Sequence, residues 1–182
     1  MMGAIIGDIV GSRFEGTGLQ KKDFDLFTQR SRATDDTIMT LAVAKSIMET
    51  VKTIELPVPG TGSDDDFHRL IAKNAVLCMQ KIGRKYPYAG YGGRFGGWLF
   101  TLDPKPYNSF GNGAAMRISP AGLAARSEQE AARLSKTITA VTHNHEEGLK
   151  GAEATAIAVY MANTGFSKDE IREKITKNYY PL

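Results

Sequence analysis

The sequence has a single cysteine, no long run of basic residues and no apolar stretch of membrane-spanning length. Because Cys78 is the only thiol, an internal disulfide and a zinc site built from several cysteines are both excluded. The first residues lack the basic segment of a secretory signal peptide, and Asp8 interrupts the apolar stretch too early for one. No segment approaches the length needed to cross a bilayer. Together these absences predict a cytoplasmic protein.

The chain also has little net charge. Its 182 residues carry a formal net charge of +3, and the longest basic run is Lys21–Lys22, so a nucleic-acid-binding surface is not predicted. Hydrophobic residues make up 42% and charged residues 24%, which is typical of a globular protein, and the length predicts one domain over residues 1–182. The long apolar runs have helical spacing and no segment alternates convincingly as a strand would. The predicted fold class is all-α.

The central feature of the sequence is Thr34-Asp35-Asp36, which precedes a long apolar helix predicted over about residues 35–52. Thr34 is a candidate N-cap, and the helix dipole favours carboxylates in the first turn. The same side chains offer oxygen ligands of the kind that Mg²⁺ and Mn²⁺ prefer. Adjacent residues on a regular helix diverge by about 100°, so convergence on one ion requires the chain to bend at the helix entrance. Capping alone and a metal site both fit this spacing.

Before this motif, three glycines recur at intervals of four residues, at Gly3, Gly7 and Gly11. On a helix they form a smooth stripe that another backbone can approach closely. Glycine inside a helix is less favourable than alanine by about 1 kcal/mol, so three of them indicate a packing or site requirement. Asp8 and Glu15 are the carboxylates of this segment. Taken singly, each is more often a surface or capping group than a catalyst.

A second informative stretch, Ser109-Phe110-Gly111-Asn112-Gly113, leads into a predicted short helix. Backbone N–H groups at a glycine-lined helix entrance suit a phosphate, because they lie at the positive end of the helix dipole. The pattern is neither a Walker loop nor a dinucleotide-binding fingerprint. A tight turn before a helix explains the same residues, and both interpretations stay open.

Later in the chain, His143 and His145 precede a helix rich in alanine. Without a third nearby ligand they are a poor zinc pair, and contact with an anionic ligand is the alternative. Ser127 and Ser167 are each followed by a glutamate three positions on, which predicts a capping box at the start of two further helices.

Four motifs follow one another along nearly the whole chain: Gly7-Asp8-Ile9-Val10-Gly11-Ser12-Arg13-Phe14-Glu15, Thr34-Asp35-Asp36-Thr37, Ser109-Phe110-Gly111-Asn112-Gly113-Ala114-Ala115-Met116-Arg117 and Thr142-His143. In this order and spacing the chain resembles the ADP-ribosylglycohydrolase family, which includes the dinitrogenase-reductase-activating glycohydrolases. The resemblance implies an all-α orthogonal helical bundle around a pair of divalent ions, Mg²⁺ or Mn²⁺. It implies a metal-dependent hydrolase that cleaves the glycosidic bond between ADP-ribose and a protein or small-molecule acceptor.

The resemblance also implies roles for particular residues. Thr34, Asp35 and Asp36 would be metal ligands. Glu15 would lie beside the metals and the scissile bond, and it would be catalytic together with Asp36. The diphosphate and the neighbouring ribose would be held by Ser109, Phe110, Gly111 and Asn112, and His143 would contact the ligand from the side.

The chain departs from the family pattern near its end. Members of the family usually continue for several dozen residues and carry a late Gly-Asp-x-Asp-Thr/Ser motif that supplies further ligands, and no such motif is present here. The expectation is therefore a C-terminally truncated member that binds metal weakly. Two alternatives to the hydrolase follow. One is a catalytically impaired ADP-ribose-binding module, and the other is an assembly subunit that forms oligomers through the face left by the missing part.

Overall fold

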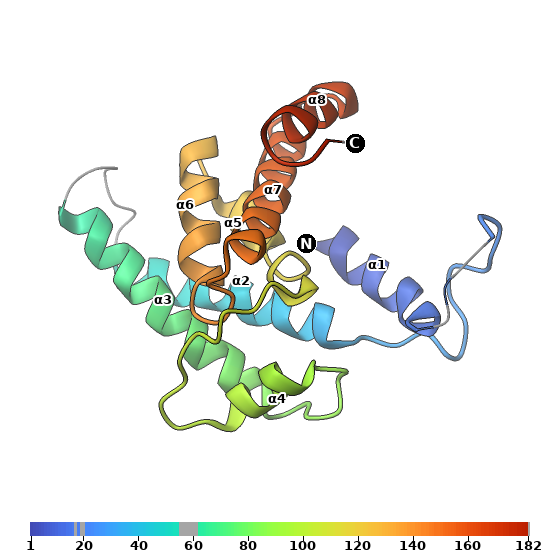
Figure 1. Cartoon of the computed structure of the whole chain (residues 1–182), viewed down its shortest axis with the longest axis horizontal. Helices are drawn as coiled ribbons and strands as arrows, with labels where there is room; N and C mark the ends of the chain where they lie inside the picture. The colour runs from blue at the N-terminus through green and yellow to red at the C-terminus, as the bar shows by residue number, and fades with distance from the viewer. Residues whose placement is uncertain (17, 19–20, 55–61, 182) are drawn as a thin grey trace.

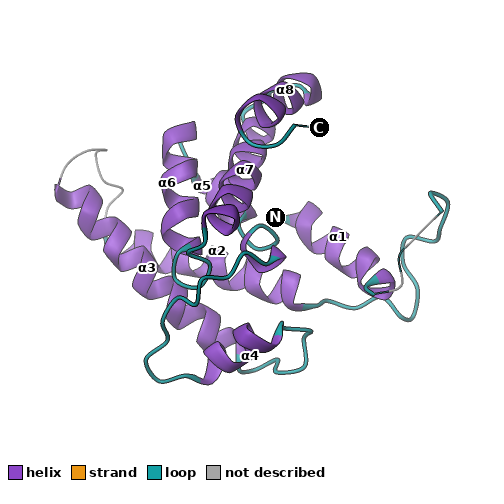
Figure 2. Cartoon of the chain, in the orientation of Figure 1, coloured by secondary structure: helices purple, strands orange, loops and turns teal. Residues whose placement is uncertain are grey.

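The computed structural model describes residues 1–16, 18, 21–54 and 62–181, and these residues form helices and loops with no strand (Figures 1 and 2). The all-α prediction is confirmed. The α-helices are α1 (Met2–Gly11), α2 (Asp35–Thr53), α3 (Gly62–Gly83), α4 (Gly93–Phe100), α5 (Ser119–Ala124), α6 (Glu128–Thr139), α7 (Glu146–Asn163) and α8 (Lys168–Asn178). Two short 3₁₀ helices, η1 (Ser12–Phe14) and η2 (Asn112–Ala114), adjoin the loops of the site described below.

The core is centred on α2, which begins at Asp35 as the sequence predicts. Its apolar residues recur at intervals of three and four, so one face of the helix is apolar and packs along α3. The buried residues of this interface include Ile38, Met39, Ala42, Val43 and Ile47 of α2 and Phe67, Ile71, Ala75 and Met79 of α3. Because α2 is held along its length, its N-terminus occupies a defined position, and the predicted acidic pair lies there.

Helices α5, α6 and α7 pack together, with α5 against α2 and α6 against α3 (Figure 1). The approach of α5 to α7 depends on Gly122, because a Cβ atom there would lie 2.3 Å from the backbone oxygen of Ala156. A smaller apolar cluster around Ile157 and Met161 joins α7 to α8. The turn between α6 and α7, which carries the two predicted histidines, is therefore anchored on both sides.

Helix α1 differs from the others because none of its residues is fully buried. It packs against α2, while Met2 and Ile6 are exposed to solvent. A Cβ atom built on Gly3, Gly7 or Gly11 would meet nothing within 4 Å. Within the described part of the chain, the packing that the glycine stripe led us to expect does not occur.

The two predicted capping boxes have different outcomes. At α8 the box is complete: Ser167 accepts from the backbone N–H of Glu170, and the Glu170 carboxylate accepts from the backbone N–H of Ser167. At α6 only half of it forms. The Ser127 hydroxyl accepts from the backbone N–H of Glu130, but the Glu130 carboxylate binds the backbone N–H and guanidinium of Arg126 instead. The charge-assisted contact with Arg126 is the stronger of the two options.

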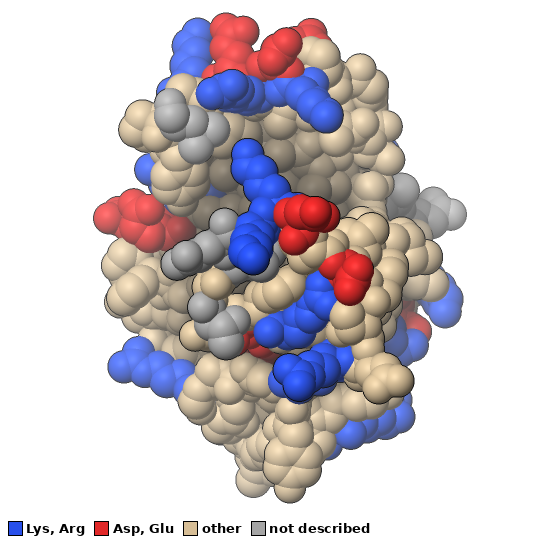
Figure 3. All heavy atoms as spheres, turned by 90° about the vertical axis from the view of Figure 1, so that its right-hand side faces the viewer, with Lys and Arg blue, Asp and Glu red and all other residues tan. Residues whose placement is uncertain are grey.

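On the face drawn in Figure 3, the described residues form no large patch of one charge. Lys and Arg side chains lie among Asp and Glu side chains on this face, in keeping with the small net charge (Figure 3). Among the described helices, none is both long enough and apolar enough to span a membrane.

Candidate active site

A pocket of about 520 Å³ brings together residues from five separate parts of the chain, including the loop before α4 and the first residues of that helix. One wall is acidic and comes from the loop after η1 and the N-terminus of α2. The other comes from the loop around η2 and from the turn before α7. The residues that line it are Glu15, Asp35, Asp36, Gly90, Gly92, Gly93, Arg94, Phe95, Tyr107, Ser109, Gly111, Asn112, Gly113, Met116, Arg117 and His143. Seven predicted site residues are in this set, whereas Thr34 and Phe110 are not.

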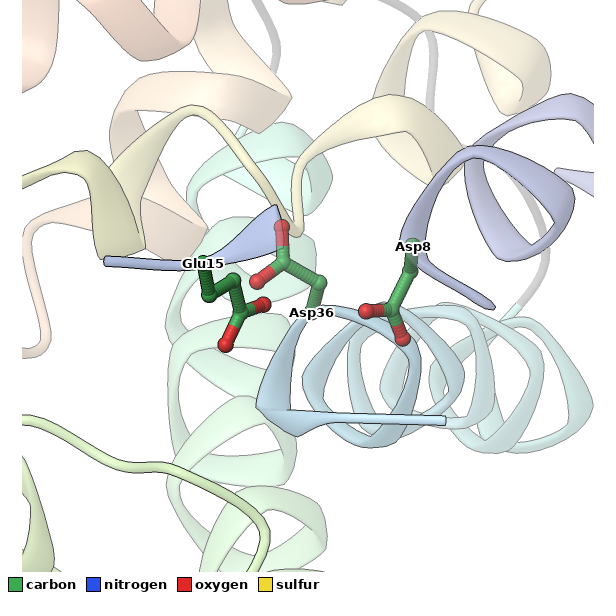
Figure 4. Close-up of side chains that lie close together, drawn as sticks. All are labelled: Asp8, Glu15 and Asp36. Atoms are coloured by element: carbon green, nitrogen blue, oxygen red, sulfur yellow. The ribbon is translucent and has the colours of Figure 1, made fainter. Parts of the chain in front are cut away.

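Three carboxylates converge beside the pocket, and two of them, Glu15 and Asp36, line it. Asp8, Glu15 and Asp36 each offer an oxygen, and these oxygens lie within 4.8 Å of one another. Figure 4 shows the three side chains, from α1, from the loop after η1 and from the first turn of α2, pointing toward a common region. Only Asp36 was predicted as a metal ligand. Hard oxygen donors gathered in this way match the preference of Mg²⁺ and Mn²⁺.

Asp8 connects α1 to the start of α2. Its Oδ2 accepts hydrogen bonds from the backbone N–H groups of Thr34, at 2.8 Å, and Thr37, at 3.1 Å. Its Oδ1 accepts from the Thr34 hydroxyl at 2.5 Å. A carboxylate at this end of a helix satisfies free N–H groups and is favoured by the helix dipole. The sequence did carry a signal for this role, because Asp8 is the only charged residue of α1.

Thr34 is the N-cap of α2, as predicted. Its Oγ1 accepts from the backbone N–H of Asp36 at 3.4 Å while donating its proton to Asp8. The side chain is almost fully buried, so it lies behind the acidic cluster and does not form part of the pocket wall. Its role as a metal ligand stays a prediction.

Asp35 and Asp36 both line the pocket, and their negative charges disfavour one another. Burial, followed by the charge of Asp36, raises the pKa of Asp35 to about 6. Burial and the charges of Asp8 and Glu15 raise the pKa of Asp36. Gly90 adopts a φ of +109°, and a Cβ atom there would lie 3.2 Å from Asp35 Oδ1, so glycine is required where this loop meets the acidic pair.

The opposite wall is formed by the loop from Ser109 to Gly113. The Ser109 hydroxyl accepts from the backbone N–H of Gly111 at 3.2 Å, which holds a tight turn. The loop enters the three-residue helix η2, and α5 begins only at Ser119, so the predicted helix start is a single 3₁₀ turn. Phe110 lies outside the pocket lining and is 72% exposed, with its ring 5.3 Å from that of His145.

His143 completes this wall from the turn between α6 and α7. The backbone N–H of Tyr107 donates to the carbonyl of Thr142, and that of Asn108 donates to the side chain of Asn144. These bonds hold the Ser109–Gly113 loop against His143. His145 instead serves as the N-cap of α7, where its Nδ1 accepts from the backbone N–H of Glu147.

One buried cation behind this wall was not predicted as a site residue. The side chain of Arg117 is fully buried, and its Nη2 donates to Thr142 Oγ1 at 2.6 Å. A signal was present in the sequence, because Arg117 is the only charged residue between Lys105 and Arg126. A charge in the middle of such an apolar stretch requires a specific partner.

The sequence model of the family described as ADP-ribosylglycohydrolase matches residues 1–180. The chain therefore belongs to the ADP-ribosylglycohydrolase family, and the resemblance noted from its motifs is confirmed.

Its curated relatives include proteins named ADP-ribosylhydrolase ARH3. The one from Danio rerio is 26% identical over 189 residues, covering 91% of this chain and 47% of that protein. The one from Xenopus tropicalis is 27% identical over 176 residues, covering 91% and 49%. The one from Homo sapiens is 28% identical over 200 residues, covering 93% and 50%. The chain thus spans about half the length of the curated relatives it matches.

Proposed function

We propose that this protein is a metal-dependent hydrolase that cleaves the glycosidic bond between ADP-ribose and a protein or small-molecule acceptor. One observation carries the proposal. In a member of the ADP-ribosylglycohydrolase family, the acidic cluster faces the Ser109–Gly113 loop and His143 across one pocket. The relatives in the comparison are named ADP-ribosylhydrolases, which supports the same reaction class.

The residues of the acidic wall fit a divalent cation. Asp36, Glu15 and Asp8 supply converging carboxylate oxygens, and Asp35 lies beside them. Burial and mutual repulsion raise the pKa values of Asp35 and Asp36, so a bound cation would relieve an unfavourable concentration of negative charge. Mg²⁺ or Mn²⁺, when bound, would polarise coordinated oxygens and lower the pKa of a coordinated water. In the proposal the ligands are Thr34, Asp35 and Asp36, joined by Asp8.

The remaining residues bind and orient the substrate. Cleavage of a ribosyl bond develops positive charge on the sugar, so the Glu15 carboxylate stabilises that charge and orients a water molecule for attack. Ser109, Gly111 and Asn112 hold the diphosphate through the hydroxyl, the backbone and the amide. The exposed ring of Phe110 offers a face for the ribose or the adenine. His143 contacts the ligand from the side.

A binding module is the second candidate. The small number of carboxylates favours this candidate. Three of them converge among the described residues, and a pair of metal ions would need more ligands. Such a protein would bind ADP-ribose through the Ser109–Gly113 loop without releasing it from an acceptor.

The test is release of ADP-ribose from an ADP-ribosylated protein under single-turnover conditions, with the chain in excess and Mg²⁺ or Mn²⁺ added. We expect release that requires the cation and is lost in Asp36→Ala and Glu15→Gln. Asp66→Ala serves as the control, because Asp66 is an exposed helical carboxylate whose ion pair among the described residues is with Arg69, at 2.8 Å. Release that is unchanged by chelation or by Asp36→Ala contradicts the proposal. Binding of free ADP-ribose without any release identifies the binding module.

A further inference from the structure

Arg117 carries a positive charge in the interior, and no carboxylate of the described residues pairs with it. Its side chain is fully buried, and among the described residues its Nε and Nη1 atoms have no hydrogen-bond partner. Within the described part of the chain its side chain makes one hydrogen bond, the 2.6 Å contact from Nη2 to Thr142 Oγ1. Its guanidinium carbon lies 5.3 Å from the centre of the Phe95 ring. Burying an unpaired charge is costly, so this arrangement indicates a role beyond packing.

Thr142 joins this charge to His143. Its Oγ1 lies 2.6 Å from Arg117 Nη2 and 2.7 Å from His143 Nδ1. Arginine can only donate, so the hydroxyl oxygen accepts from Arg117 and keeps one proton to donate. The competing acceptor, the Thr139 carbonyl, is 3.4 Å away and already accepts the backbone N–H groups of Thr142 and His143.

The direction of the bond to His143 follows from its length and from the neighbouring cation. A separation of 2.7 Å is ordinary for a hydroxyl donor and short for an N–H donor. The cation withdraws electron density from the hydroxyl, which makes the hydroxyl a stronger donor and a weaker acceptor. Thr142 therefore donates to Nδ1, and the ring proton of neutral His143 must be on Nε2.

We propose that Arg117 and Thr142 are positioning residues that hold His143 as the neutral Nε2–H tautomer, with that N–H presented to the ligand. The Nε2 edge of the ring lies against the loop proposed to hold the diphosphate. A Cβ atom placed on Gly113 would be 3.3 Å from Nε2, and one placed on Gly111 would be 4.0 Å from it. Among the described residues Nε2 has no hydrogen-bond partner. Burial, and then the charge of Arg117, lower the pKa of His143 to about 4, which keeps the ring neutral at neutral pH.

The ligand chemistry follows from this tautomer. A neutral Nε2–H group donates one hydrogen bond and recognises an oxygen acceptor, such as a phosphoryl or ribose oxygen. A ring that is neutral and holds its proton through the reaction is not the general acid or base. This assignment of a ligand oxygen rests on the proposed function, whereas the tautomer itself does not.

The tautomer is measured directly by two-bond ¹H–¹⁵N correlation of the histidine rings at neutral pH in the wild type, Thr142→Val and Thr142→Ser. The sequence has three histidines, so His143 is assigned by its loss in His143→Gln. We expect the Nε2–H form in the wild type and in Thr142→Ser, which keeps the hydroxyl, and a mixture of tautomers in Thr142→Val, which has a similar shape without it. Thermal unfolding of each variant verifies that it is folded. An Nδ1–H ring in the wild type, or the same pure Nε2–H form in folded Thr142→Val, overturns the proposal.

Calorimetric titration with ADP-ribose tests the contact with ligand. Loss of the fixed donor in Thr142→Val should weaken binding by roughly 5- to 10-fold, the usual effect of one hydrogen bond, while Thr142→Ser binds as the wild type does. If the wild type does not bind ADP-ribose at all but retains the Nε2–H ring, the proposed function fails and the positioning of His143 stands. If the wild type binds and Thr142→Val binds equally well, the role of the tautomer in recognition is refuted.

Discussion

At the scale of single residues, Asp8 has two roles that compete with each other. Its carboxylate satisfies backbone N–H groups at the start of α2, and it also adds negative charge to the cluster with Glu15 and Asp36. The hydrogen bonds stabilise the folded chain, whereas the added negative charge destabilises it when no cation is bound. Hydrogen bonds to a half-buried, charged acceptor usually outweigh repulsion that water partly screens.

Replacing Asp8 should therefore destabilise the protein even though it removes repulsion. We expect Asp8→Ala to lower the free energy of unfolding by about 2 kcal/mol, because three hydrogen bonds at the N-terminus of α2 are lost. Asp8→Asn keeps one acceptor oxygen and should lose less. Urea denaturation without divalent ions measures both changes. A gain in stability for Asp8→Ala would mean that charge repulsion in the cluster dominates.

His143 should make stability depend on pH. Its pKa falls from 6.5 to about 4 on folding, so the unfolded chain binds more protons between these values. The contribution of His143 is complete above pH 6.5 and is lost as the pH falls toward about 4, with a total on the order of 3 kcal/mol.

The raised pKa of Asp35 acts in the opposite direction, so the effect of His143 must be read as a difference between proteins. We expect the stability of the wild type, relative to that of His143→Gln, to decline over this range in urea denaturation at a series of pH values. A constant difference between the two proteins would show that His143 titrates normally in the folded state.

At the scale of the helix, glycines in α1 and α5 have opposite functions. Gly7 lies on an exposed face where a Cβ atom would meet nothing within 4 Å, whereas a Cβ atom on Gly122 would lie 2.3 Å from the Ala156 oxygen and 2.9 Å from the Val159 side chain. The first glycine weakens its helix without a visible contact in return. The second allows two helix backbones to approach closely.

The two substitutions to alanine should therefore change stability in opposite directions. Gly7→Ala should stabilise the chain by up to about 1 kcal/mol through helix propensity. Gly122→Ala should destabilise it by about 2 kcal/mol or more, because α5 and α7 must separate. Both are measured by denaturant unfolding of the 182-residue chain. Destabilisation by Gly7→Ala would indicate that another element packs on the glycine face of α1 in solution.

At the scale of the whole molecule, the proposed reaction is limited by the number of carboxylates that could hold a cation. The described residues bring three carboxylates together. Three carboxylates can hold one ion that keeps several water ligands, but they leave few protein ligands for a second ion. Catalysis also requires the ribose and the attacking water to be held in line, and small errors in position cost on the order of a hundredfold in rate.

We therefore expect the 182-residue chain alone to hydrolyse ADP-ribosyl bonds very slowly or not at all over multiple turnovers, while keeping weak affinity for ADP-ribose. Steady-state release of ADP-ribose with saturating Mg²⁺ or Mn²⁺ measures this, with Asp35→Ala and Asp36→Ala as the comparison. Rapid turnover that these substitutions abolish would show that the chain completes its catalytic site with the residues it has.

The sequence alone determined the secondary structure and the order of the motifs. Helical spacing of apolar residues and local caps predicted the all-α fold and the start of α2 at Asp35, because these signals act between residues a few positions apart. The site roles of Glu15, Asp36, Ser109 and His143 were implied by the family resemblance and not by local spacing, and all four residues line the pocket. The local pattern overestimated the helix after Asn112, where a single 3₁₀ turn forms.

Only the tertiary structure decided which of these side chains meet. Asp8 joins the acidic cluster because α1 packs against the N-terminus of α2, and Arg117 reaches Thr142 across 25 positions of sequence. Phe110 turns toward His145 and away from the pocket lining. Contacts of this kind depend on how whole apolar faces pack together, and hydrophobic burial is non-directional, so no local pattern encodes them.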